Sequence, residues 1–286
     1  MEYELNQING LKNKIREIER SRFILYNNQE AIDFILSFFE LDNKGAARCR
    51  VWTKDLESGK QIIARYGKNQ KMISLGKENI MKQLFEAHTT YFYEFIFDAN
   101  GIKNSFTKDQ KKGQLVGISP VMDIDAPSIF INEGTKNEAI LGRENIFDYI
   151  DDFNSTIGII DNEMKECELE YDICFSGNGI YIIGKPFYST KIGEIYHYAD
   201  KFTELINDVN HIKSNKLEIH DNSKAWSYYY KIPFTFHVNR QRISIPLRKG
   251  KLDGEWVDKM TDIKNLNNGC KHIIHEIIRR SKWKWQ

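Results

Sequence analysis

The chain has 286 residues, of which 41% are hydrophobic and 28% charged, with a formal net charge of +1. This is the composition of a globular protein of one large or two small domains, and it excludes a disordered or collagen-like chain. No apolar run approaches the ~20 residues of a membrane span, and the N-terminus lacks the features of a secretion signal. We therefore expect a cytoplasmic protein with no membrane partner. The four cysteines form no Cys-x-x-Cys pair, which argues against zinc and a disulfide framework.

The charges are unevenly distributed along the chain. Ten acids and one base lie between residues 144 and 172, whereas residues 222–252 hold seven bases and no acid. The C-terminal tail adds four more bases, interleaved with Trp283 and Trp285. A basic, aromatic stretch within a neutral chain is typical of a protein that holds a polyanion on one face. A solvated basic face without a binding role explains the same pattern equally well.

The N-terminal third is expected to be mainly helical. Apolar residues at three- and four-residue steps predict helix over the first 40 residues and again from Glu78 to Tyr93. The shorter, broken pattern between Ala46 and Ile73 favours a hairpin followed by a turn. A lysine-rich loop at 98–113 is the best candidate boundary. We therefore predict three parts: an N-terminal part at 1–113, a core at 114–252, and a basic C-terminal helix and tail at 253–286.

The central part alternates short strands with helices. A strand is predicted at 115–125 and a mostly helical acidic segment at 143–167. Two short apolar runs at 171–175 and 180–183 flank Asn178-Gly179, a strong hairpin signal because both turn residues must take positive φ. An amphipathic helix at 192–209 precedes a strand at 217–221 and aromatic-rich strands that continue to residue 247. Strands, helices and antiparallel returns in this order predict an α+β fold.

Asp123 and Asp125 form an Asp-x-Asp pair in the predicted strand at 115–125. Side chains alternate along a strand, so both carboxylates project from one face while Met122 and Ile124 point into the core. Two such carboxylates repel each other unless a cation lies between them. Hard oxygen ligands suit Mg²⁺ or Mn²⁺ with bound phosphates. A solvated strand edge is the alternative explanation of the pair.

A glycine-rich segment and a basic strand region are the other candidates for chemistry. Glycines at 175–181 let backbone N–H groups approach an anion, and Ser176 and Asn178 can donate further hydrogen bonds; an ordinary tight hairpin explains the glycines as well. Asp221 ends a strand and could complete a metal site. Further along, alternation places Thr235 and His237 on one strand face with Lys231 nearby, and Arg240 and Arg242 repeat the same spacing. A hydrogen-bonded core histidine is the alternative explanation of His237.

Taken in this order, the segments resemble the motifs of the archaeo-eukaryotic primase superfamily, the primase–polymerases. The family carries an Asp-x-Asp strand, a Ser-Gly-rich hairpin ending in His, and a third Asp ahead of a basic segment that ends in His. The matching segments here are MDID at 122–125, FSGNGIY at 175–181, HD at 220–221 and KIPFTFH at 231–237. The resemblance covers residues 116–247. Tyr181 stands where the family usually has its first His, and a phenol cannot become cationic.

The resemblance implies template-dependent nucleotidyl transfer, with synthesis and extension of DNA or RNA primers by a two-metal mechanism. Its partners would be a single-stranded DNA template or primer–template and nucleoside triphosphates; no feature indicates an oligomeric state. Nothing separates a cellular from a plasmid, phage or CRISPR-associated setting. Two divalent cations, Mg²⁺ or Mn²⁺, would be held by Asp123, Asp125 and Asp221. The expected triphosphate contacts are Ser176, Asn178, Gly179, Tyr181, Lys185, Lys231, Thr235 and His237, and the expected nucleic-acid contacts are Arg240, Arg242, Arg248 and Lys249.

Other functions are compatible with part of the pattern. A polymerase-β-like nucleotidyltransferase also uses Asp-x-Asp, but its Gly-Ser pair precedes the acids, whereas Ser176-Gly177 follows them. A glycosyltransferase that binds a sugar nucleotide through Asp-x-Asp and Mn²⁺ has no need of Asp221 with a basic strand behind it. A non-catalytic module that binds single-stranded nucleic acid through a decayed site is the main alternative, and Tyr181 favours it.

Overall fold

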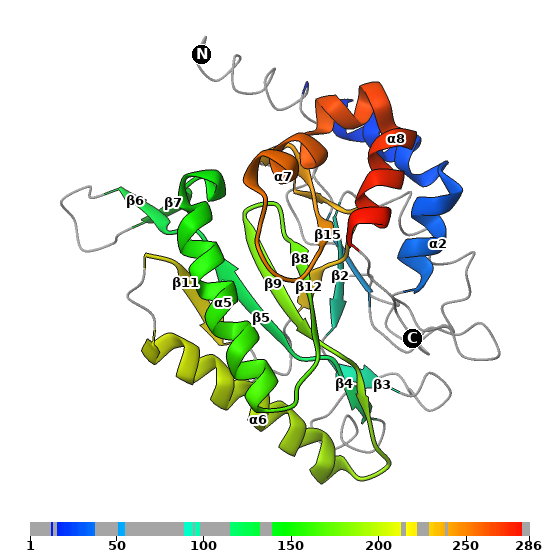
Figure 1. Ribbon diagram of the computed structural model, residues 1–286. Coiled ribbons are helices and arrows are strands. Elements are labelled where there is room, and N and C mark those ends of the chain that lie inside the picture. The colour runs from blue at the N-terminus through cyan, green and yellow to red at the C-terminus, as the bar shows by residue number, and fades with distance from the viewer. Residues whose placement is uncertain are drawn as a thin grey trace.

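The computed structural model describes residue 13 and residues 16–37, 51–54, 89–93, 95–97, 115–131, 139–212, 216–221, 229–237 and 240–281 (Figure 1). Several of these residues, His220 and Asp221 among them, are described by their backbone only. Antiparallel sheets and helices confirm the predicted α+β fold with a helical N-terminal part. Within the described ranges, none of the helices is both long and apolar enough to span a membrane. Most of the predicted hairpin at 46–73, the loop at 98–113 and the tryptophans of the tail lie outside the described residues.

A five-stranded antiparallel sheet forms the centre of the molecule (Figure 1). The hairpin predicted around Asn178-Gly179 is confirmed, because its two strands pair antiparallel from Tyr171↔Gly184 to Phe175↔Ile180. The aspartate strand occupies an interior position, with a paired neighbour on each side. The strands, in their order across the sheet, are β11 (Glu218–Asp221), β5 (Val121–Asp125), β9 (Gly179–Gly184), β8 (Tyr171–Phe175) and β15 (Ile245–Leu247).

Smaller sheets bring distant parts of the chain together. The helix predicted to extend to Tyr93 is wrong for its last five residues: Thr89–Tyr93 (TTYFY) is a strand, because β-branched and aromatic side chains favour extended backbone. The strand predicted at 115–125 is divided at Ser119-Pro120, since proline cannot donate to a ladder. The sheets are β1 (Val51–Lys54)–β2 (Thr89–Tyr93)–β12 (Tyr229–Lys231), β10 (Phe187–Tyr188)–β4 (Leu115–Ile118)–β3 (Phe95–Phe97), β6 (Ser128–Ile131)–β7 (Ala139–Arg143) and β13 (Phe236–His237)–β14 (Arg242–Ile243).

Helices cover the central sheet and join the two ends of the described chain. In Figure 1, α5 crosses in front of the sheet and α6 lies beside it. The hydroxyl of Ser21 donates to Asn267 Oδ1 at 2.8 Å. The first described helix therefore packs against the last. Residues 16–26 are helical, and the further helices are α2 (Gln29–Ser37), the 3₁₀ turn η1 (Ile146–Tyr149), α5 (Ile150–Glu166), α6 (Ile192–Ile212), α7 (Gly254–Thr261) and α8 (Ile263–Ser281).

The helix boundaries follow from apolar spacing and capping. The buried residues of α5 recur at three- or four-residue steps, as expected for one helix face. The amphipathic helix predicted at 192–209 is confirmed as α6. Asp253 caps α7, since its side chain accepts from the N–H of Trp256 at 3.0 Å. One hydrophobic cluster joins the helices to the sheet, and each fully buried Ile, Leu or Phe in it contributes about 1.5–3 kcal/mol of hydrophobic stabilisation.

Candidate functional site

The Asp-x-Asp strand presents its acids from an otherwise buried backbone. Along β5, Val121, Met122 and Ile124 are fully buried, whereas Asp123 and Asp125 are partly exposed. Antiparallel pairing sets Tyr181 of β9 opposite Asp123 and Gly179 opposite Asp125. Directly opposed residues share one face of a sheet. The two acids and the end of the glycine-rich turn therefore lie on one face, as the alternation predicts.

The turn at 176–179 is closed around the hydroxyl of Ser176. Its Oγ accepts from the N–H of Gly179 at 3.0 Å and, at 3.4 Å, from that of Asn178. The N–H of Ser176 donates to the carbonyl of Gly179 at 2.9 Å. Gly177 has φ +100°, a backbone conformation that favours glycine. In this structure these amides shape the turn, with Ser176 and Asn178 both buried.

Close backbone approaches bring the turn against both other motifs. A Cβ at position 179 would lie 2.2 Å from the carbonyl oxygen of Ile124 and 2.5 Å from Oδ1 of Asp125. A Cβ at position 177 would lie 2.4 Å from the Cβ of His237. Only glycine fits at such distances without a shift of the neighbours. The Asp-x-Asp strand, the glycine-rich turn and the segment that ends in His237 therefore meet at one place.

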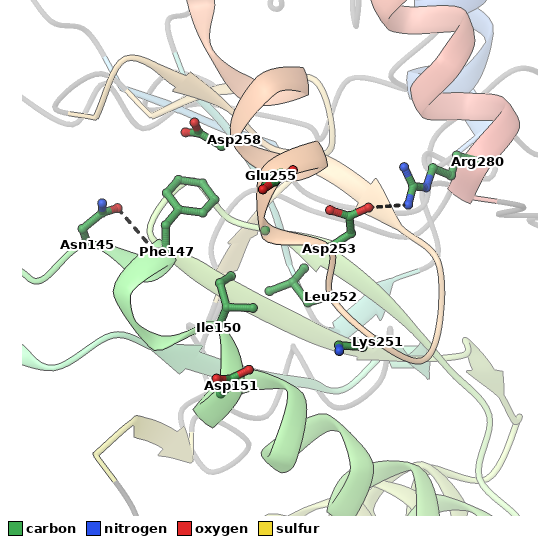
Figure 2. Close-up of a pocket in the computed structure, with 11 residues that line it drawn as sticks. Asn145, Phe147, Ile150, Asp151, Lys251, Leu252, Asp253, Glu255, Asp258 and Arg280 are labelled. Carbon is green, nitrogen blue, oxygen red and sulfur yellow. Dashed lines mark hydrogen bonds and ion pairs between the residues drawn. The ribbon is translucent and has the colours of Figure 1, made fainter.

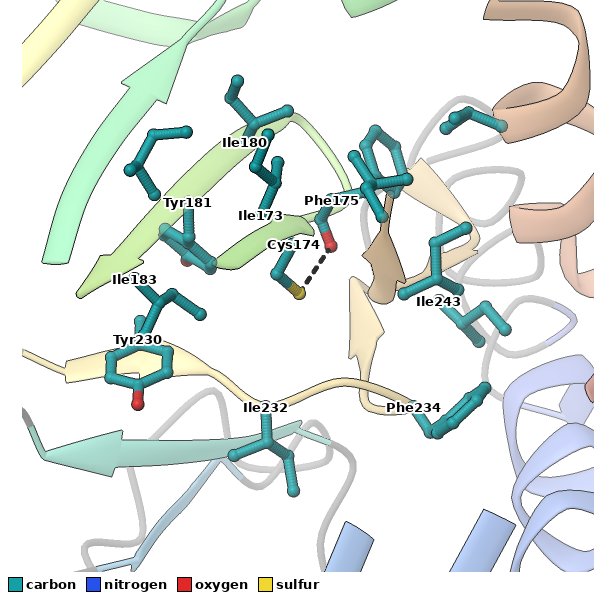
Figure 3. Close-up of a cluster of buried hydrophobic side chains, with 14 of the residues drawn as sticks. Ile173, Cys174, Phe175, Ile180, Tyr181, Ile183, Tyr230, Ile232, Phe234 and Ile243 are labelled. Atoms are coloured by element: carbon teal, nitrogen blue, oxygen red, sulfur yellow. Dashed lines mark hydrogen bonds between the residues drawn. The ribbon is translucent and has the colours of Figure 1, made fainter. Parts of the chain in front are cut away.

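Tyr181 belongs to the core on the same face of the sheet as the acids, beside Asp123. It is 4% exposed, and its ring contacts that of Tyr230 edge-to-face, with centroids 5.9 Å apart (Figure 3). We expected a side chain that reaches a phosphate; the structure instead packs this one between the central sheet and β12. Lys185 is also removed from the turn. It lies just beyond the opposite end of β9, where its Nζ pairs with Asp172 at 2.6 Å.

The segment from Lys231 to His237 does not alternate as a continuous strand. Lys231 ends β12, and β13 consists of Phe236 and His237 alone. Between them Phe234 has φ +60°, which breaks the alternation. Thr235 is 0% exposed, and its side chain hydrogen-bonds that of Tyr26. We expected it to face a phosphate beside His237; of the two, the structure leaves only His237 partly exposed.

An arginine that the sequence pattern did not single out joins the acidic strands. Nε of Arg143 lies 3.1 Å from Oδ2 of Asp125, and its Nη1 pairs with Glu218, which stands opposite Asp125 in the sheet. Ser128 donates to Glu218 through its N–H at 2.8 Å and its hydroxyl at 3.0 Å. Partial burial alone would raise the pKa of Glu218, but hydrogen bonds from Arg143 and Ser128 lower it overall.

The third predicted metal ligand is displaced by one position in the register. His220 stands opposite Asp123, whereas Asp221 stands opposite Met122 at the end of β11. Asp221 thus lies on the strand next to β5, but one position away from the residue that pairs with Asp123. Among the described side chains, no group of three or more His, Cys, Asp or Glu is arranged to hold a metal. The site therefore brings together Asp123 and Asp125 from one strand, and places Asp221 beside them by backbone only.

The predicted nucleic-acid contacts divide into two pairs. Arg240 donates to the backbone oxygens of Arg143 and Glu144, so it supports the end of β7. Arg242 pairs with Asp258 and lies over the ring of Phe147 at 4.6 Å. These two guanidinium groups are engaged in internal contacts rather than displayed as we expected. Arg248 and Lys249, by contrast, are exposed after β15.

A hollow of about 790 Å³ lies away from these motifs, where η1 and the start of α5 face the start of α7 (Figure 2). Neither Asp123 nor Asp125 lines it. Its lining is mainly acidic, with two cations, and the charged members are Asp151, Asp253, Glu255, Asp258, Lys251 and Arg280. Such a lining does not favour an anion, so we do not place the nucleotide here.

Comparisons with known proteins give a limited result. No family model matches the chain. No curated protein matches it by sequence. Among solved structures, the chain is similar to the polymerase domain of ligase D from Mycobacterium tuberculosis in complex with DNA, with 9% sequence identity and a TM-score of 0.49 over 87% of this chain and 88% of that one. At this level the likeness assigns neither a family nor an activity to the chain.

Proposed function

We propose that this protein is a template-dependent nucleotidyltransferase, a primase–polymerase that synthesises and extends DNA or RNA primers. One observation carries the proposal: the backbone of Gly179 lies against Asp125 while that of Gly177 lies against His237. Three segments that are separate in sequence, and that resemble the primase–polymerase motifs in their order, are thereby adjacent in space. Chance occurrence of each motif gives no reason for the three to meet.

The donor set fits hard divalent cations. Asp123 and Asp125 supply carboxylate oxygens on one strand face, and Arg143 already places positive charge beside Asp125. Two ions, Mg²⁺ or Mn²⁺, would be held by Asp123 and Asp125, and when bound they would activate a 3′-hydroxyl and neutralise the triphosphate. Asp221 opposes Met122 in the sheet, so its service as a third ligand would require the end of β11 to leave this register. Arg143 would keep the carboxylate of Asp125 in a fixed orientation, and Glu218 would balance the charge of Arg143.

The chain's own residues would bind and orient the triphosphate on the same face. His237 lies against Gly177 and is partly exposed, so its imidazole is the first candidate for a phosphate contact. Lys231, partly exposed at the end of β12, is the second. Ser176 and Asn178 would act mainly by holding the turn in shape. The exposed Arg248 and Lys249 would contact the phosphates of a template strand, which carry no sequence information.

A non-catalytic module that binds single-stranded nucleic acid is the second candidate. Two observations favour it: Tyr181 is buried in the core, and the carboxylate of Asp125 is already ion-paired with Arg143. Such a module would bind the template strand but not the nucleoside triphosphate. This difference is measurable.

Primer synthesis on a single-stranded template, with labelled nucleotides and Mn²⁺, tests the proposal. We expect short products from the native chain and none from Asp123→Asn, which retains the size of the side chain. Asp200→Asn changes an exposed acid on α6 by the same chemistry and is the matched control. Products that require an added primer would mean a polymerase without initiation. A folded native chain that forms no product with or without a primer would refute the proposal.

A further inference from the structure

We propose that a second cavity, next to the acidic hollow, is a binding site for phosphate groups. It has a volume of about 330 Å³, at the lower end of the range for ligand sites, which suits a group of nucleotide size or smaller. It lies between the loop that follows β15 and the beginning of α7, and the end of α8 closes it. None of the predicted metal or triphosphate residues lines it.

The register places this cavity on the other face of the central sheet from the acids. Leu247 lines it and pairs with Ile173, which pairs in turn with Ile182 and so with Met122. Met122 projects from β5 opposite to Asp123. The cavity therefore lies apart from the proposed metal and triphosphate site, although Arg248 and Lys249, proposed above as template contacts, line it. The inference does not rest on the nucleotidyl-transfer activity.

The cavity is lined by donors and positive charge. Four cationic side chains face a single acid, Asp253, which is already committed as the cap of α7 and as the partner of Arg280 at 2.7 Å. Among the described residues, Arg248 and Lys251 form no ion pair, so their charge is available. The cationic residues are Arg248, Lys249, Lys251 and Arg280.

Trp256 adds an aromatic ring to the wall of the cavity. Its Nε1 is buried without an acceptor in the described part of the chain. Because this atom is closed to solvent, it is not counted among the donors that an anion in the cavity would contact. Arg280 lies over the ring of Trp256 at 4.5 Å, which fixes both side chains at the wall of the cavity. Lys249 lies over the ring of Tyr171 at 4.4 Å.

The neighbouring hollow provides the electrostatic contrast. It shares Lys251, Asp253 and Arg280 with this cavity, but its remaining charged lining is acidic. An anion is therefore repelled on one side of the shared wall and attracted on the other. This local field favours a compact, highly charged anion such as a phosphate over a carboxylate or a neutral sugar.

Calorimetric titration with inorganic pyrophosphate, in EDTA and in a His237→Ala background, tests the site without a contribution from the proposed active centre. The cavity variant is R248A/K249A/K251A, three exposed side chains. The matched control is K259A/K264A/K271A, which removes the same charge from exposed positions outside the cavity. We expect pyrophosphate affinity to fall more than tenfold in the cavity variant and by less than twofold in the control.

Competition then identifies the source of the phosphate. If a single-stranded oligonucleotide without a terminal phosphate displaces pyrophosphate, the site is assigned to the strand backbone. In that case the slope of log K for strand binding against log salt concentration should decrease in magnitude by about two in the cavity variant. Displacement only by a 5′-phosphorylated strand or a free nucleotide would assign it to terminal phosphates. Equal losses in the cavity and control variants, or no pyrophosphate binding by the native cavity, would overturn the proposal.

Discussion

The guanidinium of Arg143 lies with its Nε 3.1 Å from Oδ2 of Asp125, the second acid of the Asp-x-Asp strand. The same side chain pairs with Glu218 on the neighbouring strand β11. Arg143 thus compensates two carboxylates whose backbones stand opposite each other. Without it, the face that carries the acids would hold uncompensated negative charge in a partly buried setting.

Removal of this cation should destabilise the fold. We expect Arg143→Ala to lower the free energy of unfolding by about 1–3 kcal/mol, since the partly exposed partners lose charged hydrogen bonds. The double variant R143A/E218Q should recover part of the lost unfolding free energy, because it removes one of the two carboxylates that lose their cationic partner. Urea unfolding measures both effects. Arg279→Ala, which removes an exposed ion pair to Glu276 on α8, should cost less than about 1 kcal/mol. Equal losses in both single variants would argue against a supporting role for Arg143.

Divalent cations should compensate for the missing guanidinium. If Asp123 and Asp125 hold metal, Mn²⁺ adds charge at the position that Arg143 vacates. We therefore expect Mn²⁺ to raise the melting temperature of Arg143→Ala more than that of the native chain. A differential scanning measurement with and without Mn²⁺ tests this, and Asp123→Asn in the Arg143→Ala background should abolish the gain. A shift that survives Asp123→Asn would place the metal elsewhere.

Two glycine substitutions should have opposite effects. Gly179→Ala introduces a Cβ 2.2 Å from a backbone oxygen, so the turn must move away from Asp125, and we expect a loss of about 1–3 kcal/mol. Gly158→Ala lies on the exposed side of α5 with no neighbour within 4 Å, and should stabilise the helix by about 0.5–1 kcal/mol. Thermal unfolding of the two variants distinguishes them. A neutral Gly179→Ala would mean that the turn is not held against the acid strand.

The pH dependence of stability should carry a contribution from Glu218. Its pKa is lowered in the folded state from the ordinary value of 4.5, so the unfolded chain binds this proton more tightly. The resulting stability is fully present above pH 4.5 and is lost as the pH falls through the folded-state pKa. We expect Glu218→Gln to show a shallower loss of unfolding free energy than the native chain between about pH 5 and pH 3. Glu255→Gln removes an exposed carboxyl group on α7 and is the matched control.

The elements that were predictable from the sequence depend on local signals. Asn178-Gly179 between two apolar runs predicts a hairpin, and the structure confirms the pairing of its two strands. The expected positive φ at both residues of the pair is wrong, because the positive φ of this turn falls on Gly177. The spacing in α6 is equally local. The alternation in β5 correctly placed Asp123 and Asp125 on a common face, because that strand is uninterrupted.

The parts that could not be predicted depend on backbone breaks and distant pairings. Alternation was expected to continue through the segment from Lys231 to His237 and through the segment from Arg240 to Arg242, but Phe234 interrupts the first and Gln241 the second, each with positive φ. A positive φ at either residue changes the direction of the side chains that follow. The sequence does not indicate it, because neither position holds the glycine or asparagine that commonly adopts positive φ. Arg143 meets Asp125 only through the pairing of β6 with β7, which no short motif encodes.

The most direct test of the central claim is calorimetric binding of a deoxynucleoside triphosphate with Mn²⁺, in the absence of any template. We expect saturable binding to the native chain. Asp123→Asn and His237→Ala should each reduce the affinity at least tenfold, because each removes a side chain from one of the segments that meet at the glycine-rich turn. The cavity variant R248A/K249A/K251A should bind the triphosphate at the proposed active centre as the native chain does. A folded native chain that binds single-stranded DNA but no triphosphate with Mn²⁺ would contradict the account and favour the non-catalytic binding module.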